Sequence, residues 1–420
     1  MTSILQLTLK SVWNRRLSVA LTVFSIALSV ALLLGVERLR QDARTSFANT
    51  ISGTDLVVGA RSGPVQLLLY AVFHLGNATN NIEMKSLDAL AAHRAVSWVV
   101  PISLGDSHKG YRVIGTTPAF FERYRYGNAQ ALSFASGAPF QGLFDAVVGA
   151  EVAEKLGYQT GDPIVVAHGS GEVSLADHDD KPFKITGILA RTGTPLDRSV
   201  LVSLPAIEAI HLDWFGGAPV PGLKLSPDEV TRFDLAPKTV TAALVGLKTR
   251  AAVFQVQRFV NDHKAEPLLA ILPGATLQEL WSLIGVAEQA LLAVSAMVVA
   301  VGLAGLIAVV MAGLAERRRE LAILRSLGAS PRHVFALLAS ESLLLTLIGC
   351  ALGILLLTAT SIALAPWLLS QYGLQLTVSL PSSREGLLLL AVLGAGLLAS
   401  LLPALRAYRL SLADGMTVRM

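Results

Sequence analysis

Residues 316–331, ERRRELAILRSLGASP, are the stretch on which the interpretation of the chain depends, because long uncharged segments precede and follow it. Charged side chains occupy its first five positions, and apolar side chains then recur at a helical spacing. Gly328 can end this helix, and Ser330 and Pro331 are typical of the cap and the first position of the next one. A short amphipathic helix between two apolar segments is expected to contact a partner at the membrane surface.

The composition indicates a membrane protein. Of the 420 residues, 53% are hydrophobic and 15% are charged, against roughly 25% charged in an average soluble protein. The net charge is +4, and the basic residues form short clusters without interleaved aromatic side chains, which argues against nucleic-acid binding. The single cysteine, Cys350, lies in an apolar run, so it is expected to be a small buried side chain outside any disulfide within the chain.

Four apolar segments are long enough to cross a bilayer, which requires about 20 residues. None of them contains Lys, Arg, Asp or Glu, and they are residues 17–36, 290–315, 342–365 and 386–405. The first segment is longer than the apolar core of a signal peptide and is not followed by a typical cleavage site. We therefore predict that it is retained as a membrane span.

The distribution of positive charge predicts the orientation of these spans. Lysine and arginine precede the first span, and arginines follow the second and the fourth, whereas the turn over residues 366–383 has neither Lys nor Arg. Both termini are therefore predicted to be cytoplasmic, as is the stretch that begins at residue 316. The long segment between the first two spans is predicted to lie outside the membrane.

Two spans are predicted to belong to helices longer than the membrane is thick. A helix over about residues 16–50 would measure roughly 50 Å, and one from residue 276 to 315 roughly 60 Å. We expect both to form a stalk under the external domain, the alternative being separate helices with kinks at the membrane surface. The residues that indicate the stalk are the helical stripe Val36, Leu39, Ala43 and Phe47 and the capping-box pair Thr276 and Glu279.

Small residues at four-residue spacing predict close helix packing inside the membrane. Contacts within one chain and contacts between two copies both explain such faces. No ionisable residue lies in the middle of a span, which argues against an ion-coupled pump. The small residues are Ala300, Ala304, Ala308 and Ala312 in the second span, Gly349 and Gly353 in the third, and Ala395 and Ala399 in the fourth.

The segment between the first two spans is expected to be a mixed α/β domain with two lobes. A Pro/Gly-rich stretch over residues 215–229 is predicted to be a loop or a hinge between them. Short apolar runs predict strands at residues 55–58, 111–114, 146–148, 164–167, 183–189, 199–202 and 242–247. Helical patterns occur at residues 86–92, 150–156 and 252–263, and residues 242–272 are expected to form a strand–helix–strand unit.

Residues 64–81, PVQLLLYAVFHLGNATNN, are unusually apolar for a segment of this domain. We predict a core helix followed by a turn. The alternative is that this segment lines an apolar cleft or meets the outer leaflet, near the stalk.

Histidines and carboxylates within about 45 residues of one another raise the possibility of a metal site, but their spacing matches no closed zinc pattern. The HDDK sequence at residues 178–181 is expected to be an exposed turn, and we assign no metal ligand. Metal binding near His178 stays open as an alternative. The residues concerned are His168, Asp177, His178, Asp179, Asp180, His211 and Asp213.

The chain resembles the family of ABC transporter permeases that includes MacB, the lipoprotein-releasing permeases LolC and LolE, and FtsX. The stretches that carry the resemblance are ERRRELAILRSLGASPRHVF after the second span, NRRLSVALTVFSIALSVALLLGV at the first span, VVGAEVAEKLGYQTGDPIVV and PFKITGILARTGTPLD in the external segment, and PALRAYRLSLADGM near the end. The resemblance implies a permease subunit in the bacterial inner membrane, with its large domain in the periplasm and with a second permease chain, identical or different, as partner.

The resemblance also implies that the opening stretch is a coupling helix that docks on a cytoplasmic ABC ATPase. The chain has no GxxxxGK[ST] sequence and no other recognisable catalytic motif, so the ATPase that binds ATP and Mg²⁺ is expected to be a separate chain, and this chain is expected to be non-catalytic and to bind no cofactor. The coupling residues would be Glu316, Arg317, Arg318, Arg319, Glu320, Leu321, Leu324, Arg325, Leu327 and Gly328.

The expected fold is an α-helical membrane protein with four transmembrane helices and a large mixed α/β extracytoplasmic domain between the first and second helices. The expected parts are residues 1–16 (cytoplasmic segment), 17–50 (first transmembrane helix and stalk), 51–275 (extracytoplasmic domain), 276–315 (stalk and second helix), 316–335 (coupling helix), 336–365 (third helix), 386–405 (fourth helix) and 406–420 (cytoplasmic tail).

The expected function is mechanotransmission, in which ATP hydrolysis on the partner moves the periplasmic domain. The exported or extracted substrate would be a lipoprotein, a lipid or an apolar small molecule, handled with a possible periplasmic or outer-membrane partner. The alternative is an FtsX-like transducer that activates a periplasmic hydrolase without transporting anything. A receptor or scaffold without an ATPase fits the coupling helix poorly.

Overall fold

The computed structural model describes residues 16–50, 52–169, 176–215, 218–220, 225–316, 330–372, 379 and 381–409. The chain divides into two compact units. The membrane unit comprises Met1–Asp42, Gly285–Trp367 and Leu376–Met420, and the α/β unit comprises Ala43–Ile284 and Leu368–Gln375.

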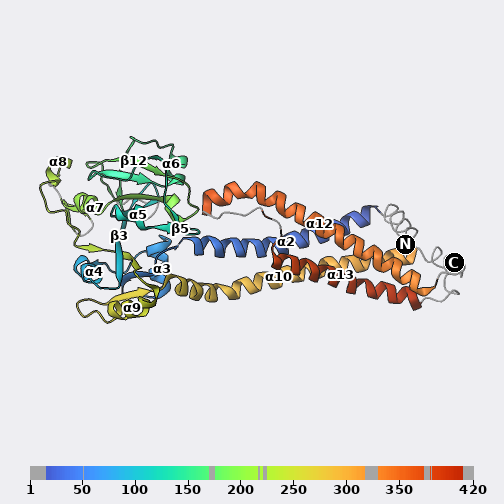
Figure 1. The fold of residues 1–420 in the computed structure, drawn as a ribbon. Helices are drawn as coiled ribbons and strands as arrows, with labels where there is room; N and C mark the ends of the chain where they lie inside the picture. Colours follow the sequence, from blue (N-terminus) through green and yellow to red (C-terminus); the bar gives the residue numbers. More distant parts are fainter. Residues whose placement is uncertain are drawn as a thin grey trace. The chain divides into compact units, whose positions relative to one another are not determined.

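Four long helices account for the predicted membrane spans (Figure 1). They are the only helices in the described part of the chain that are long and apolar enough to cross a membrane. This finding confirms the predicted number of spans. The helices are α2 (Arg16–Asn49), α10 (Pro273–Glu316), α12 (Pro331–Tyr372) and α13 (Ser383–Arg409).

Helices α2 and α10 are unbroken over 34 and 44 residues, or about 50 and 66 Å at 1.5 Å per residue. The predicted start of α10 is wrong, because the helix begins at Pro273, and Thr276 lies inside its first turn, where its N–H donates to Leu272 O at 3.0 Å. Proline is favourable at the first helical position because the missing N–H would have no helical partner there. Thr276 and Glu279 therefore do not form the predicted capping box.

Helix α12 runs past the predicted end of the third span and contains Pro366. A proline removes one backbone hydrogen bond, and membrane helices tolerate this loss because neighbouring groups satisfy the freed carbonyl. Pro403 lies inside α13 in the same way. A proline in these spans is thus a poor indicator of a helix end.

Glycine allows α12 to pack closely on α2 in the membrane unit. A Cβ atom added to Gly349 would lie 2.5 Å from Ile26 Cγ2, and one added to Gly353 would lie 2.8 Å from Ala27 O. The predicted packing role of these two glycines therefore belongs to contacts within the chain.

The predicted alanine face of α10 lies on an exposed side of the helix. Ala300, Ala304, Ala308 and Ala312 are exposed in this chain. Instead, α10 meets α2 at Gly302, whose added Cβ would lie 3.0 Å from Ser29 Oγ, and the Ser29 hydroxyl donates to Val298 O at 3.2 Å.

We expect Gly353→Ala and Gly394→Ala to change the stability of the permease in opposite directions. Alanine favours a helix by about 1 kcal/mol over glycine, and nothing lies within 4 Å of a Cβ added at Gly394. At Gly353 the new methyl group meets backbone, and such overpacking costs about 1–3 kcal/mol. The measurement is the thermal unfolding midpoint of the full chain in one detergent. Equal midpoints for the two variants would contradict the packing described for Gly353.

The α/β unit is built on a 12-stranded sheet whose main path is β18-β1-β17-β3-β4-β13-β8-β12-β7. The first half of β3 pairs with β17, and its second half pairs with β4 and β10. The strands on this path are β1 (Leu56–Ala60), β3 (Val96–His108), β4 (Tyr111–Thr116), β7 (Phe134–Gly137), β8 (Asp145–Val148), β12 (Phe183–Leu189), β13 (Ser199–Ser203), β17 (Ala242–Leu247) and β18 (Leu268–Ile271).

Short strands and helices complete the α/β unit. The further strands are β2 (Ile82–Glu83), β5 (Arg125–Tyr126), β6 (Gln130–Ala131), β9 (Pro163–Ile164), β10 (Ala167–His168), β11 (Ala176–Asp177), β14 (Trp214–Phe215), β15 (Ala218–Pro219) and β16 (Thr239–Val240). The helices are α3 (Pro64–Val72), α4 (Met84–Ala91), α5 (Ala119–Arg123), α6 (Ala150–Leu156), α7 (Leu204–His211), α8 (Pro227–Val230), α9 (Val253–Asn261), and the 3₁₀ turns η1 (Pro195–Arg198) and η2 (Arg250–Ala252).

Three apolar clusters form the core of this unit. One packs α4 and α9 against β1, β17 and β18, and a second packs α6 and α7 against β8, β12 and β13. A third contains α3 and α5, together with Phe47 of α2 and Leu277 and Trp281 of α10. The third cluster places the end of α2 and the start of α10 beside the sheet within the α/β unit.

Candidate functional site

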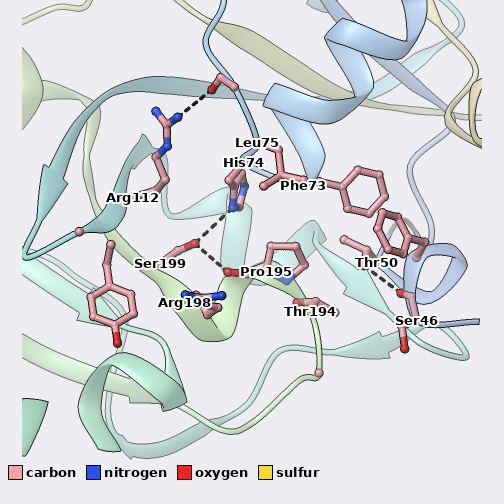
Figure 2. A pocket seen from close by; sticks show the side chains of 15 residues that line it. Ser46, Thr50, Phe73, His74, Leu75, Arg112, Thr194, Pro195, Arg198 and Ser199 are labelled. Carbon is pink, nitrogen blue, oxygen red and sulfur yellow. Dashed lines mark hydrogen bonds between the residues drawn. The ribbon is translucent and has the colours of Figure 1, made fainter. Parts of the chain in front are cut away.

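A cavity of about 400 Å³ lies in the α/β unit beside the end of α2 (Figure 2). Its volume is in the range typical of small-molecule sites, roughly 300–1,000 Å³. Segments far apart in the sequence meet there. The lining residues are Ser46 and Phe47 of α2 and Thr50 directly after it, Phe73 to Gly76 after α3, Gly110 to Arg112 at the turn into β4, and Gly193 to Pro195, Arg198 and Ser199 at the start of β13.

Hydrogen bonds fix the polar wall of this cavity. His74 Nδ1 lies 3.2 Å from Ser199 Oγ, whose hydroxyl donates to Pro195 O at 2.9 Å, and Arg112 donates to Gly76 O at 2.8 Å (Figure 2). Burial, together with the nearby Arg112 charge, lowers the pKa of His74 to about 4. His74 is therefore neutral at pH 7, and Phe47, Phe73 and Leu75 leave the other side of the cavity apolar.

Residues 64–81 form both a core helix and part of the wall of a cavity, in different parts of the segment. Leu67, Leu68 and Tyr70 of α3 are fully buried in the core, as the favoured prediction requires. The residues after the helix, from Phe73 to Gly76, line the cavity next to the end of α2, as the alternative requires. His74 has a φ of 55°, an unusual value for a residue with a side chain, and this turn directs the chain out of the core.

Ion pairs join the helices of the membrane unit at the outer ends of the predicted spans. Arg38 of α2 donates to Glu385 of α13 through Nε at 3.0 Å and through a second nitrogen at 3.4 Å. Arg40 of α2 contacts Glu37 at 2.7 Å and Glu288 of α10 at 3.5 Å. Because the bidentate Arg38–Glu385 pair is geometrically specific, it fixes how α2 and α13 meet in this unit, and the Arg40–Glu288 contact joins α2 to α10.

Two family models match the chain over most of its length. The MacB-like periplasmic core domain matches residues 19–257, more than half of the chain, and the FtsX-like permease C-terminal model matches residues 292–412. The chain belongs to the MacB/FtsX-type family of ABC transporter permeases. The permease is therefore a multi-pass membrane protein with an extracytoplasmic domain, and its family implies an ATPase partner.

Two solved structures resemble parts of the permease. The periplasmic region of MacB from Actinobacillus actinomycetemcomitans is 8% identical, with a TM-score of 0.34, over 56% of this chain and 94% of that chain. The extracellular domain of the noncanonic ABC-type transporter YknZ from Gram-positive bacteria is 12% identical, with a TM-score of 0.31, over 52% of this chain and 99% of that chain. No curated protein sequence matches the permease.

The predicted stalk stripe is only partly on the packed side of α2 in the permease. Phe47 packs on Phe73 and Trp281, with ring centroids 4.6 and 5.5 Å apart, whereas Leu39 is 44% exposed. Val36 and Ala43 are half-buried. The buried positions between these apolar residues are the charged Glu37, Arg38 and Asp42. Sequence patterns that count only apolar residues miss a packed face that is built from ion pairs.

Most of the predicted coupling residues, from Arg317 to Gly328, lie outside the described residues. Glu316 is the last residue of α10, and α12 begins at Pro331, where a new helix was expected. The role of the coupling residues stays a prediction.

The structure brings three of the predicted histidines of the permease together with a carboxylate that the sequence did not single out. His168, His178 and His211 meet at Asp106. The carboxylates near them in the sequence are used elsewhere, because Asp180 and Asp213 both pair with Lys181, at 2.6 and 2.8 Å, and Asp179 is exposed. Asp177 lies in β11.

The expectation of an exposed HDDK turn is wrong at both ends, since His178 and Lys181 are buried. Two carboxylates neutralise the lysine, which makes its burial tolerable.

Burial raises the pKa of Asp106, but hydrogen bonds from His168 and His211 outweigh it and bring the pKa to about 2. Burial and the charge of His211 lower the pKa of His178 to about 4. For His211, the Asp106 carboxylate outweighs burial and raises the pKa.

Proposed function

We propose that the permease transmits the ATP-driven motion of a separate cytoplasmic ATPase to its α/β unit in the periplasm, and so exports or extracts a lipoprotein, a lipid or an apolar small molecule. The chain would work in a bacterial inner membrane, with both termini in the cytoplasm, beside a second permease chain. This chain would bind no ATP, because the nucleotide and Mg²⁺ would bind to the ATPase.

The observation that carries this proposal is the pair of unbroken helices. Helix α2 begins in the membrane unit and ends in the α/β unit, and α10 begins in the α/β unit and ends at Glu316, the first of the predicted coupling residues. The two helices contact each other within both units, through Arg40 and Glu288 in the membrane unit and through Phe47 and Trp281 in the α/β unit. A displacement applied at the end of α10 would therefore be shared with α2.

The cavity supports an apolar substrate. It is lined by Ser46, Phe47 and Thr50 at the end of α2, so a shift of that helix end changes its shape. Its aromatic and aliphatic side chains favour an acyl chain or another apolar group, and the few polar groups offer orientation. None of the described spans carries a charged residue within residues 17–36, 290–314, 342–365 or 386–405, which fits a substrate handled outside the membrane centre.

The FtsX-like alternative is signalling without transport, and it shares the same mechanical parts. Mass spectrometry of molecules retained by the purified permease–ATPase complex distinguishes the two functions. We expect a lipid, lipoprotein or other apolar molecule at near-stoichiometric amounts with the wild-type chain. The variant Leu75→Asp places a charge in the cavity wall and should lower retention at least tenfold, because desolvating a carboxylate there costs more than about 1.4 kcal/mol.

The matched control is Phe233→Asp, which changes an exposed apolar side chain outside the cavity and should leave retention unchanged. If the only retained molecule is a periplasmic protein and no apolar ligand is found, the signalling function replaces export. Equal loss of ligand in both variants would contradict the cavity as the binding site.

A further inference from the structure

Four side chains of the kinds that bind metals converge in the α/β unit, away from the cavity of Figure 2. Asp106, His168, His178 and His211 each offer one ligand atom, and these atoms all lie within 4.8 Å of one another. Asp106 and His178 are buried, while the side chains of His168 and His211 are 28% and 26% exposed. The cluster is therefore held by the core and remains open to solvent on one side.

The fold delivers these residues from four separate segments. His168 of β10 lies directly opposite Asp106 of β3 in the antiparallel pair, and a bulge in β3 between Leu104 and Ser107 falls at this point. A bulge re-aims the side chains beside it, as is common at functional sites. His211 is the last residue of α7, and His178 precedes β12.

Three of the ligand atoms form a nearly equilateral triangle. Asp106 Oδ1 lies 3.3 Å from His168 Nδ1 and 3.4 Å from His211 Nε2, and the two nitrogens are 3.2 Å apart. Zinc binds imidazole nitrogen and carboxylate oxygen at about 2.0–2.2 Å with tetrahedral geometry, so two of its ligand atoms are about 3.3–3.5 Å apart. The triangle has the dimensions of one face of such a tetrahedron.

A backbone hydrogen bond directs Nε2 of His211 toward the centre of the cluster. His211 Nδ1 lies 2.8 Å from Ile207 O, and a carbonyl oxygen only accepts, so Nδ1 carries the proton. Nε2 faces Asp106 and His168, and it can bind a metal ion once it gives up the proton that it donates to Asp106. Backbone carbonyls orient metal-binding histidines in this way. Electron-rich atoms this close repel one another unless a proton or a cation lies between them.

His178 offers the fourth ligand atom of the cluster. It is 1% exposed, and neither of its ring nitrogens has a hydrogen-bond partner among the residues that the structure describes. A buried imidazole without a partner is costly and calls for an explanation. The ring is held between His211 and Trp214, with centroid distances of 5.2 and 4.4 Å. A metal ion bound to one of its nitrogens would satisfy it.

We propose that Asp106, His168, His178 and His211 form a binding site for one divalent late first-row transition metal, with zinc as the reference ion. Three imidazoles and one carboxylate favour zinc, copper or nickel over Mg²⁺ and Ca²⁺, which prefer oxygen ligands. Four protein ligands complete a tetrahedral shell and are typical of a structural site. The ion links β3, β10, the segment before β12 and the end of α7, and this site is independent of the ATPase and of the substrate.

The test uses the full chain, purified in detergent without a histidine tag and freed of metal with a chelator. After incubation with ZnCl₂ and removal of unbound ions, we expect about one zinc per chain by elemental analysis. We also expect zinc, but not CaCl₂, to raise the thermal unfolding midpoint. The double variant His178→Asn/His211→Asn should lose both effects. The control His93→Asn/His263→Asn, which removes two histidines outside the cluster, should keep them.

Cobalt gives a second readout that needs no variant, because four-coordinate Co²⁺ absorbs visible light much more strongly than six-coordinate Co²⁺. We expect a strong visible band for wild-type chain loaded with CoCl₂ and its disappearance when ZnCl₂ is added. This band supports the site even if the double variant does not fold. A weak octahedral spectrum, or equal zinc content in the wild type and the cluster variant, would overturn the proposal and leave a hydrogen-bonded cluster.

Discussion

Replacing Leu321 and Leu324 with alanine is expected to lower the affinity of the permease for its ATPase by at least about 100-fold. The proposed coupling helix would bury both leucines in a groove of the ATPase. Complete burial of a leucine contributes about 1.5–3 kcal/mol, and each 1.4 kcal/mol corresponds to a tenfold change in the dissociation constant. The two substitutions together therefore remove most of the apolar contribution to docking, and the ATPase should no longer co-purify with the chain.

The matched control is Leu321→Met/Leu324→Met, which keeps the apolar volume of both side chains and should retain the ATPase. The thermal unfolding midpoint of all three chains, measured without the ATPase, should be the same, because both leucines of the proposed coupling helix would contact the ATPase. Co-purification of the alanine variant at the wild-type level would contradict the assignment of residues 316–328 as the coupling helix.

Removal of the Arg38 side chain should cost about 3–5 kcal/mol of unfolding free energy, the effect typical of breaking a buried ion pair. The Arg38→Ala variant leaves the Glu385 carboxylate, only 4% exposed, without the partner at 3.0 Å that now balances its charge. The measurement is a denaturation titration of the full chain in mixed micelles.

Two further variants test the origin of this loss. Arg384→Ala removes an arginine that is 70% exposed and 3.9 Å from Glu37, so its effect should stay within about 0.5 kcal/mol. The exchange Arg38→Glu/Glu385→Arg restores opposite charges and should recover part of the stability. If Arg38→Ala is as stable as Arg384→Ala, the pair does not hold α2 and α13 together.

The order of spans, helices and strands along the permease is largely predictable from its sequence, because segment length, hydropathy and periodicity can be read from neighbouring residues. The four spans, the continuous helix from Arg16 to Asn49 and the strand–helix–strand unit of β17, α9 and β18 follow from such signals. Strand β3 does not, since Pro101 and Gly105 inside it argue against a central strand. The structure accommodates Gly105 at a bulge.

The candidate sites depend on contacts between distant residues, which no local pattern reveals. His168, His178 and His211 are visible as histidines in one region, but Asp106 is separated from them by 62 or more positions and becomes a neighbour only through the pairing of β3 with β10. The cavity likewise joins the end of α2 to the turns before β4 and β13. In the sequence, a charged residue such as Arg38 or Glu385 interrupts the apolar pattern that indicates a packed helix face. In the structure, these two residues form a hydrogen-bonded ion pair that joins α2 to α13.

The central claim is that motion at the coupling helix reaches the α/β unit. The most direct test measures the distance between two spin labels, one on the α/β unit of each permease chain in the complex. Each chain would carry Cys350→Ser, which removes the only native cysteine, and Phe254→Cys at an exposed position of α9. We predict that ATP with vanadate changes the distance distribution measured by double electron–electron resonance. We also predict that Leu321→Ala/Leu324→Ala abolishes this change at ATPase concentrations that saturate the wild type. The same distribution with and without nucleotide, or an unchanged response in the alanine variant, would contradict the account.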